Sequence, residues 1–463
     1  KHALELDKRN GDHKWADAMR EEIMQMIHEY KAFRVHDSNI PPEGYQKLRY
    51  HFVFDAKIDG QVKARWVMDG NLSPEMPREE CFASVVSTEA VRLGFILAQV
   101  QNLKCVTGDV GNAFLTAFTS EKIYVVAGPE FGEFEGAIMI MQKAVYGTKT
   151  AALRFHEALS VRLRRQGFTP SQAEPDFWWR KTKAGFEYIA RYVDDIICYS
   201  KHPEKILGKL SRFYKLKRVG KVEFFLGADL MELPTTWNCQ YQFSARSYIK
   251  RILSDHEALT QQKFKEYDTP MSQDYHSEED MTPLCNIKEH AIFRSLIGSA
   301  NWCITLGRYD IMFAVNNLAQ YAVAPRQGHL AHLLRIFGYL TKYPFAATPF
   351  DGNFVDPKVT NQLEFQPLHD WVEIFPNAYE DVPPNAPSQK QGERFQITCY
   401  VDADHARNTV TRRSVTGILL LLNNTPLVWI SRRQRTVETS TFGSEVIAAR
   451  TAIDLIVEMR YKL

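Results

Sequence analysis

The alternation of apolar and polar positions predicts a mixture of helices and strands in the first part of the chain. Apolar residues recur at helical spacing over residues 13–30, with Asp12 as a plausible N-cap. Two strands are expected at 50–54 and 62–67, joined by the turn signal Asp59-Gly60. Further elements predicted up to residue 166 are strands at 103–110 and 122–127 and helices at 88–100 and 143–166.

The stretch Ile189 to Tyr199 is the most informative pattern in the sequence. Two arms of β-branched and aromatic residues flank Asp194-Asp195, which predicts a strand, a tight turn and a returning strand. Adjacent carboxylates repel each other unless a cation neutralises them, and oxygen ligands on a rigid hairpin suit Mg²⁺. The alternative is a turn that uses Asp only for its geometry, so the motif needs a third carboxylate.

Asp109 supplies that third carboxylate at the end of a predicted strand. This strand and the Asp194-Asp195 hairpin can lie side by side in one antiparallel sheet. Three such carboxylates suit two Mg²⁺ ions about 4 Å apart, which can activate a 3′-hydroxyl and stabilise a pyrophosphate leaving group. The chemistry would consist mainly of positioning and charge stabilisation.

The composition and the periodicity change twice in the second half of the chain. Helical patterns at 248–253, 290–305, 310–321 and 329–340 give way to a proline-rich, acidic stretch without periodicity, which predicts a linker or insertion. Strands at 395–401, 417–422 and 427–430 and a helix at 444–461 follow. The predicted parts are a helical lead-in (1–35), a main domain (36–230), a helical region (231–343), the linker (344–394) and a C-terminal domain (395–463).

Composition describes a globular protein of two to four domains, with 463 residues, 45% hydrophobic and 24% charged. No apolar run approaches 18 residues and no signal-peptide core is present, so no membrane association is expected. The chain does not begin with Met, which suggests a piece of a longer protein. Seven cysteines without a CxxC pair favour reduced thiols in an intracellular protein.

The net charge of +2 does not indicate an anionic partner by itself. The distribution of the cations is more informative, and two basic patterns stand out. Residues 201–221 predict a basic amphipathic helix, whose cations either face solvent or follow a phosphate backbone. Lys63 and Arg65 occupy alternate positions of a strand and therefore share one face. They serve either surface solubility or contact with an anionic substrate.

Ordered matches to one known family run along nearly the whole chain. The matching segments are Trp15 to Met24, Lys63-Ala64-Arg65, Phe82 to Val86, Asp109-Val110 with Ala113-Phe114-Leu115, Tyr146-Gly147 with Lys149, Tyr192-Val193-Asp194-Asp195, Phe225-Leu226-Gly227, Arg294 to Gly298, Asp310 to Val315, Asp402-Ala403-Asp404, Arg412-Arg413-Ser414 with Gly417, and Ser444-Glu445. With these residues the sequence resembles the reverse transcriptase and RNase H region of a copia-type LTR retrotransposon polyprotein.

The resemblance implies an α+β right-hand polymerase with fingers, palm and thumb, followed by a partial RNase H-like α/β domain. Its metal ligands and catalytic residues would be Asp109, Asp194 and Asp195, with Mg²⁺ as cofactor and Mn²⁺ as a substitute. Phe114 would exclude a 2′-hydroxyl, although a core role is the alternative. The other implied contacts are Lys63 and Arg65 with the triphosphate, Tyr146 and Gly147 with the nascent base pair, and Phe225, Leu226 and Gly227 with the primer end.

In the C-terminal part, Asp402 and Glu445 match two metal ligands of an RNase H, whereas Asp404 is expected to be a turn residue. The chain ends at Leu463, before the strand that would bring a further Asp, so a competent RNase H site is not expected. An unpaired sheet edge would then weaken this domain. Departures from the family pattern occur at Met68-Asp69, Thr150, Ala152 and Arg407, and the last would be strained if the position needs a positive φ.

The implied activity is RNA-directed DNA synthesis with an RNA or DNA primer-template and dNTPs. Protease, integrase and Gag parts would accompany this region in the polyprotein, in cytoplasmic virus-like particles or the nucleus; the oligomeric state stays open. A decayed or domesticated copy that only binds primer-template is the alternative. A related RNA-dependent RNA polymerase is a third hypothesis, which the aromatic at Phe114 disfavours.

Overall fold

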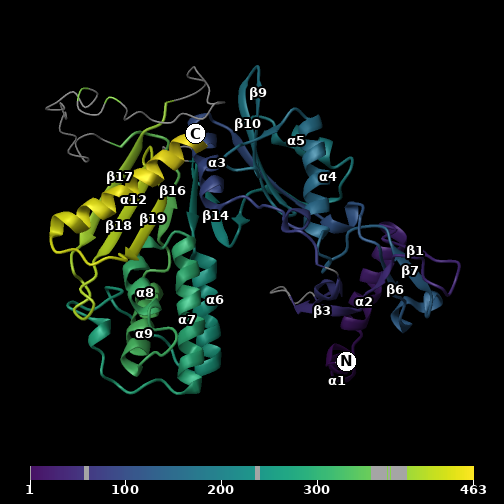
Figure 1. Ribbon diagram of the computed structural model, residues 1–463, viewed down its shortest axis with the longest axis horizontal. Helices are drawn as coiled ribbons and strands as arrows, with labels where there is room; N and C mark the ends of the chain where they lie inside the picture. The colour runs from purple at the N-terminus through teal and green to yellow at the C-terminus, as the bar shows by residue number, and fades with distance from the viewer. Residues whose placement is uncertain are drawn as a thin grey trace. The chain divides into compact units, whose positions relative to one another are not determined.

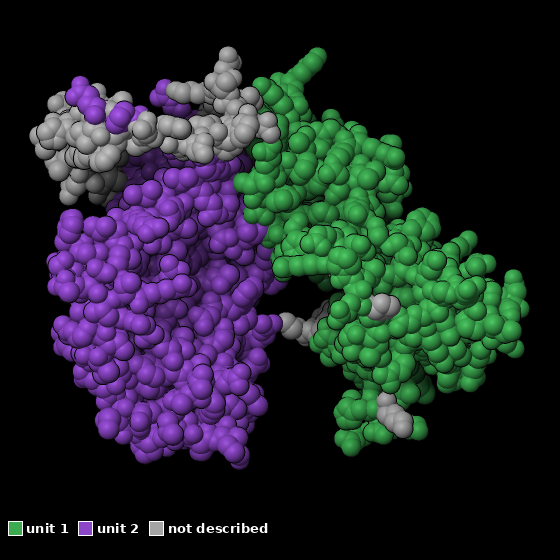
Figure 2. Space-filling view, in the orientation of Figure 1, with its two compact units in different colours: residues 1–86, 104–221 green, residues 87–103, 222–463 purple. Residues whose placement is uncertain are grey.

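The computed structural model describes residues 2–56, 62–73, 75–234, 240–355, 373, 376 and 394–463. It contains two compact units, shown in green and purple in Figure 2: unit 1 (residues 1–86 and 104–221) and unit 2 (residues 87–103 and 222–463). The predicted turn Asp59-Gly60 and most of the predicted linker lie outside the described residues. The five-part division of the sequence stays a prediction.

Unit 1 is built around a six-stranded antiparallel sheet in which β5 pairs with β11. Strand β11 continues through the predicted hairpin into β10, and β10 then pairs with β9. The sheet order is β12 (Leu216–Lys221), β5 (Lys104–Val110), β11 (Asp195–Ser200), β10 (Gly185–Tyr192), β9 (Phe177–Thr182) and β8 (Thr169–Pro170). The two strands predicted to carry the acids are therefore direct neighbours.

Helices α4 (Ala151–Arg165) and α5 (Pro203–Leu210) share a buried apolar cluster with alternate residues of these strands, including Ile196 and Cys198 of β11. Helix α4 begins later than predicted, because the chain at Gly147 adopts a φ of 92° that a helix does not permit. The prediction of one basic helix over residues 201–221 is correct only for the first half of this range. The helix ends at Leu210, and β12 follows along the edge of β5.

The remainder of unit 1 contains a second sheet, a hairpin and the N-terminal helices. Trp66 is fully buried at their centre and packs edge-on against Phe33 and Phe131. The elements are α1 (His2–Asn10), α2 (Lys14–Met24) with a π-helical turn (Gln25–Glu29), a sheet in the order β1 (Phe33–Val35), β7 (Ile138–Met141), β6 (Ile123–Val126) and β2 (Gln46–Lys47), and the hairpin of β3 (Tyr50–Ala56) and β4 (Val62–Met68).

The start of α2 is capped by a different residue from the one predicted. The carboxylate of Asp7 in α1 accepts hydrogen bonds from the backbone N–H groups of Trp15 (3.1 Å) and Ala16 (2.9 Å). Asp12 instead forms a salt bridge with Lys14. The cap comes from the preceding helix because α1 turns back beside the start of α2, which local sequence spacing does not reveal.

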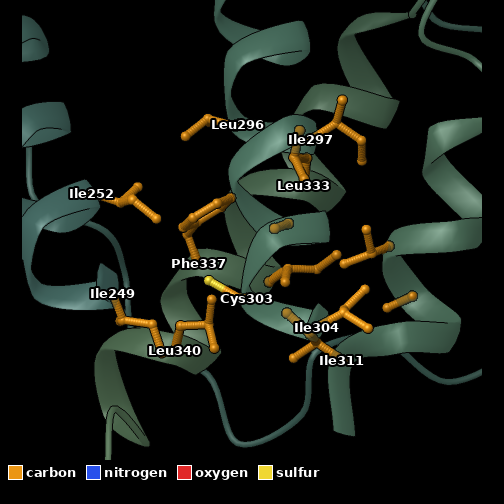
Figure 3. Close-up of a cluster of buried hydrophobic side chains, with 14 of the residues drawn as sticks. Ile249, Ile252, Leu296, Ile297, Cys303, Ile304, Ile311, Leu333, Phe337 and Leu340 are labelled. Atoms are coloured by element: carbon orange, nitrogen blue, oxygen red, sulfur yellow. The ribbon is translucent and has the colours of Figure 1, made fainter. Parts of the chain in front are cut away.

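Unit 2 begins with helix α3 (Thr88–Val100) and a four-stranded sheet, and the helices between residues 246 and 342 share a large apolar core. Figure 3 shows this core, in which Phe337 and Cys303 are fully buried. The sheet order is β13 (Phe224–Phe225), β14 (Ala228–Glu232), β15 (Tyr241–Ser244) and β16 (Ala347–Pro349), and the helices are α6 (Arg246–Thr260), α7 (Ile287–Thr305), α8 (Met312–Ala319) and α9 (Gln327–Lys342). Short 3₁₀ turns across the chain are Gly70–Leu72, Arg78–Glu80, Ala113–Thr116, Pro129–Phe134, Ser277–Glu279 and Tyr309–Ile311.

The C-terminal residues form a three-stranded antiparallel sheet, β17 (Ile397–Asp404), β18 (Val415–Leu422) and β19 (Thr425–Arg433), with α12 (Thr441–Lys462) packed on β17 and β18 (Figure 1). Strand β19 is attached to the helices of unit 2. Trp429 donates to the carbonyl of Ile304 (3.1 Å), and Asn316 donates to the carbonyl of Ser431 (2.7 Å). This part of the chain therefore packs as one body with the helical region.

Two further sequence expectations concern the environment of the chain. The six cysteines in the described ranges are free, and Cys105, Cys198 and Cys303 are buried. In those same ranges no helix has the length and apolar character needed to cross a membrane.

A buried ion pair holds the root of the Asp194-Asp195 hairpin. Asp176 and Arg191 expose 0% and 2% of their side chains, and Arg191 donates from Nε to Asp176 Oδ1 (2.7 Å). Ser84 and His156 also contact the Asp176 carboxylate. Burial alone would raise the pKa of Asp176, but the hydrogen bond from His156 and the charge of Arg191 outweigh it and hold the pKa below its ordinary value.

We expect Asp176→Asn to destabilise the protein by about 3–5 kcal/mol at pH 7.5, because Arg191 would remain buried without a counter-charge. Urea unfolding measures this loss. The matched control is Asp17→Asn, which removes an exposed pair with Arg20 and should cost less than about 0.5 kcal/mol. Because the folded pKa of Asp176 is depressed, the difference between wild type and Asp176→Asn should shrink below about pH 4. Equal losses in the two variants would contradict this role.

Candidate active site

The acidic hairpin closes through a two-residue turn of unusual backbone geometry. Tyr192 and Asp195 form the last strand pair, so Val193 and Asp194 are the turn residues. Val193 has a φ of 54°, whereas Asp194 has a negative φ, which is the pattern of a type II′ turn. A β-branched residue at positive φ is strained, by about 1–3 kcal/mol. The predicted strand, turn and strand are confirmed, and the turn stores strain at the acidic tip.

The sheet brings together the three carboxylates that the sequence singled out. Asp109 of β5 lies directly opposite Asp195 of β11, and the N–H of Val110 donates to the carbonyl of Asp194 (2.9 Å). This bond pattern makes Asp109 and Asp195 a non-hydrogen-bonded pair, in which Cα atoms are about 4.5 Å apart and side chains approach closely. Like charges in such a pair repel each other.

Burial and the repulsion between the acids both raise pKa values in this site. Burial raises the pKa of Asp195 to about 6, together with the negative charges of Asp194 and Asp109, and Arg218 opposes the shift. Burial also raises the pKa of Asp194, as does the charge of Asp109, whereas Arg65 and Lys63 lower it. The acids thus carry more negative charge than the surrounding side chains neutralise.

This donor set fits a hard divalent cation, because carboxylate oxygens with excess negative charge are the ligands that Mg²⁺ prefers. In the described parts of the chain, however, no group of three or more His, Cys, Asp or Glu side chains is arranged to hold a metal ion. The metal-ligand roles of Asp109, Asp194, Asp195, Asp402 and Glu445 therefore stay predictions.

Lys63 and Arg65 lie on β4 and reach the same site. Their charges act on Asp194, and the Arg65 guanidinium lies 5.9 Å from the centre of the Tyr146 ring. The sequence analysis expected Asp69 to place a negative charge near these cations. In the structure, the Asp69 carboxylate contacts other groups. It forms a 2.8 Å hydrogen bond with His51 and lies 3.7 Å from Arg49. Asp69 therefore has His51 and Arg49 as its own charge partners.

Phe114 and Tyr146 form an aromatic pair beside the acids. Their ring centres are 4.9 Å apart, and Phe114 is half-buried against Phe155 of α4. Burial raises the pKa of Tyr146 to about 12, with contributions from the charges of Asp194 and Asp109. Phe114 and the neighbouring Tyr146 are therefore near the carboxylates, as the proposed contact with the incoming nucleotide requires.

Gly147 is required by a close approach of two backbone segments. At a φ of 92°, a Cβ on this residue would lie 2.1 Å from the carbonyl oxygen of Met68. The N–H of Met68 donates to the carbonyl of Tyr146 (2.8 Å), which fixes β4 against the aromatic pair. Gly70, which the sequence did not single out, faces the same contact, because its Cβ would lie 2.0 Å from the Gly147 oxygen.

The sequence analysis missed two cations of this site and questioned the residue at position 150. Lys217 of β12 lies opposite Asp109, and Arg218 acts on the charge of Asp195, but the sequence pattern placed both on a helix. No local signal would have found them, because the pairing of β12 with β5 is a tertiary contact. The departure at Thr150 is accommodated, since its buried hydroxyl donates to Glu121 (2.6 Å).

Phe225, Leu226 and Gly227 form a hairpin in unit 2. Both turn residues have positive φ (48° and 87°), as in a type I′ turn, and the Gly227 Cα faces Trp302 closely. Phe225 is buried and lines a small apolar cavity of about 40 Å³. The hairpin is formed as expected, and its contact with a primer stays a prediction.

The C-terminal acids come from neighbouring elements. The N–H of Ala403 donates to the Glu445 carboxylate (3.3 Å), so Glu445 of α12 reaches the strand that carries Asp402. The strain expected at Arg407 is not found there. The residue with positive φ is Ala406 (49°), and Arg407 instead donates to the carbonyl of Tyr275 (3.0 Å).

Comparison with known proteins identifies the family of the chain. The profile of the reverse transcriptase (RNA-dependent DNA polymerase) family matches residues 30–273. The chain is 25% identical over 446 residues to the retrovirus-related Pol polyprotein from transposon RE1 of Arabidopsis thaliana, covering 94% of this chain and 27% of that protein. It is also 25% identical over 354 residues to a putative transposon Ty5-1 protein of Saccharomyces cerevisiae, covering 75% of this chain and 100% of that protein.

A solved structure of a foamy viral protease-reverse transcriptase in complex with RNA/DNA hybrid covers 96% of this chain and 56% of that chain, at 12% identity and a TM-score of 0.46. The chain spans about a quarter of the length of the RE1 polyprotein. RE1 and Ty5 are both copia-type elements, which confirms the predicted resemblance. The match over more than half of its residues shows that the chain belongs to the reverse transcriptase (RNA-dependent DNA polymerase) family, in the branch carried by copia-type retrotransposons.

Proposed function

We propose that this chain is an RNA-directed DNA polymerase that adds dNTPs to a primer 3′-hydroxyl on an RNA or DNA template. The observation that supports it best is the placement of Asp109 opposite Asp195, with Asp194 on the adjoining turn, in a chain of this family. Reverse transcriptases depend on divalent metal ions, and the oxygen donors here suit Mg²⁺, with Mn²⁺ as a substitute.

In this proposal Asp109, Asp194 and Asp195 hold Mg²⁺, which supplies charge stabilisation and activation of the primer hydroxyl when bound. Lys63 and Arg65 bind the triphosphate, because both cations already act on the charge of Asp194. The strands on both sides of Val193 and the buried Asp176–Arg191 pair keep the acids in place before substrate arrives. Catalysis then rests on positioning and electrostatics.

The aromatic pair would select the sugar. Phe114 packs against Tyr146 and is only partly buried, and in this proposal its ring would clash with a 2′-hydroxyl of the incoming nucleotide. Tyr146 and Gly147 would contact the nascent base pair. The hairpin at Phe225, Leu226 and Gly227 would hold the primer end.

Asp402 and Glu445 would bind metal in an RNase H-like site, and we propose that these two carboxylates alone leave the site incomplete, because RNA cleavage with two metal ions requires a further acid. The RE1 relative is named a Pol polyprotein, and we propose that this region likewise works beside protease, integrase and Gag parts, inside the cell. The oligomeric state stays open.

Primer extension on poly(rA)/oligo(dT) with dTTP and Mg²⁺ tests the polymerase. Wild type should extend the primer, and Asp194→Asn should lose at least about 100-fold in rate, because a charged ligand is replaced by an isosteric neutral one. Asp402→Asn is the matched control and should extend like wild type. If neither wild type nor Asp194→Asn extends the primer but both bind the duplex, the alternative of a decayed, primer-template-binding protein holds.

Replacement of Phe114 tests sugar selection. Phe114→Ala should reduce the preference for dTTP over UTP by about 10- to 200-fold, because a ring that excludes one hydroxyl is removed. The control is Phe118→Ala, which truncates a phenylalanine that is 72% exposed four residues further on. An unchanged preference in Phe114→Ala would restrict this residue to a packing role, and a native preference for rNTPs would favour an RNA polymerase.

Binding of Mg²⁺ can be measured without turnover. Adding 10 mM Mg²⁺ at pH 8 should raise the melting temperature of wild type by about 2–4 °C for each kcal/mol of binding free energy, since the cation relieves the repulsion among the acids. The gain should vanish in Asp109→Asn and persist in Asp402→Asn. A gain that persists in Asp109→Asn would place the ion elsewhere.

A further inference from the structure

Helix α2 is followed by a π-helical turn, Gln25–Glu29, which has no role in the proposed function so far. The N–H of Tyr30 donates to the carbonyl of Gln25 (2.9 Å), a bond that spans five residues instead of four. Gln25 and Tyr30 therefore lie above one another on one face, whereas in an α-helix residues four apart share a face. The amide nitrogen of Gln25 donates to Glu21 Oε1 (3.1 Å), so its oxygen is left to accept from outside the helix.

Both side chains contact the loop that follows β5, residues 111–117, called the Phe114 loop below. Gln25 Oε1 accepts a hydrogen bond from Asn112 Nδ2 (2.6 Å). The Tyr30 hydroxyl lies 3.5 Å from the carbonyl oxygen of Gly111, to which it donates. The π-helical turn thus holds the Phe114 loop at two successive residues, which an α-helical turn would not bring within reach of both side chains.

The backbone at Asn112 decides the course of this loop. Its φ of 50° and ψ of 45° lie in the left-handed region, which Asn tolerates better than most side chains. Directly after it the chain enters the 3₁₀ turn that carries Phe114, and the carbonyl of Asn112 accepts from the N–H of Leu115 (3.0 Å). The orientation of Asn112 therefore sets where the turn places Phe114 relative to Asp109 at the end of β5.

Helix α2 is itself attached to the strand that carries the cations. Met26 is buried in an apolar cluster that also contains Leu115 of the Phe114 loop. The buried carboxylate of Glu22 accepts a hydrogen bond from the backbone N–H of Trp66 on β4 (3.3 Å). One helix therefore fixes both β4, with its two cations proposed to bind the triphosphate, and the loop proposed to select the sugar.

We propose that Gln25 is a positioning residue for sugar selection, which acts through Asn112 to hold the ring of Phe114 in place. The inference rests on the proposed function, because it concerns how the polymerase recognises the 2′-position of a nucleotide. Without the hydrogen bond the Phe114 loop gains freedom, and the ring excludes an rNTP less well. The carboxylates are held separately by the pairing of β5 with β11, so the gain in melting temperature with Mg²⁺ should be kept.

The test compares dTTP with UTP in primer extension by one enzyme preparation, so that the folded fraction cancels from the ratio of kcat/KM values. Gln25→Met keeps the length of the side chain and removes its amide. The preference for dTTP should fall by about 3- to 10-fold, the range for one lost neutral hydrogen bond. The change should come from a higher kcat/KM for UTP, which a general loss of active enzyme would not produce. Gln172→Met, at an exposed position of unit 1, is the matched control and should keep the preference of wild type.

A double-mutant cycle tests whether Gln25 acts through Asn112. Asn112→Gly removes the other partner without backbone strain, because Gly adopts a φ of 50° freely. It should lower the preference by a similar factor, and the double variant should be no worse than either single variant, since both changes remove the same contact. Multiplied losses in the double variant, or a preference equal to wild type in both single variants, overturn the proposal.

Hydrogen–deuterium exchange needs no turnover and therefore separates this inference from the polymerase function. In Gln25→Met the N–H groups of Leu115 and Ala117, which donate to carbonyls within the Phe114 loop, should exchange at least about 3-fold faster, whereas those of β11 should not change. If wild type extends the primer but Gln25→Met alters neither exchange nor preference, the inference alone is overturned. If wild type does not extend the primer, the proposed function falls, and unchanged exchange would overturn the positioning contact as well.

Discussion

The constraint on which the rest of the structure depends is the pairing of β5 with β11, which places Asp109 opposite Asp195. The backbone hydrogen bonds of the sheet force two like charges together that would separate in solution. Burial raises the pKa values of Asp194 and Asp195, and the neighbouring negative charges raise them further. A site of this kind is less stable than its surroundings, and it is useful only if a cation and a charged substrate relieve the repulsion.

The surrounding structure holds the acids with buried and closely packed contacts. The Asp176–Arg191 pair is fully buried and connects β10 to the chain before β9, one residue from the start of the acidic turn. The strained φ of Val193 persists because the strands on both sides determine it. Gly147 and Gly70 allow two backbones to meet, so that Lys63 and Arg65 on β4 face the acids. These contacts prepare the site before any ligand is present.

Charge is divided between two ends of the same sheet. Lys217 of β12 lies opposite Asp109, whereas Lys201, Lys205 and Lys209 line a cavity together with residues of the β9–β10 hairpin. The basic run from residue 201 to 221 is therefore divided between a helix and a strand. This division depends on where the chain leaves α5 and joins the sheet edge.

The sequence by itself determined the elements with strong periodicity and the identity of the acids. Helix 88–100 and the hairpin at 189–199 are found as predicted, because alternation and turn chemistry are local. The ordered motifs determined the family. Only the tertiary structure decided that residues 216–221 form a strand, that Asp7 caps α2, that Asp69 binds His51, and that Gly70 is needed. Each of these depends on a partner in another element of the chain, and local periodicity carries no information about which backbone edge or charge of another element a residue will meet.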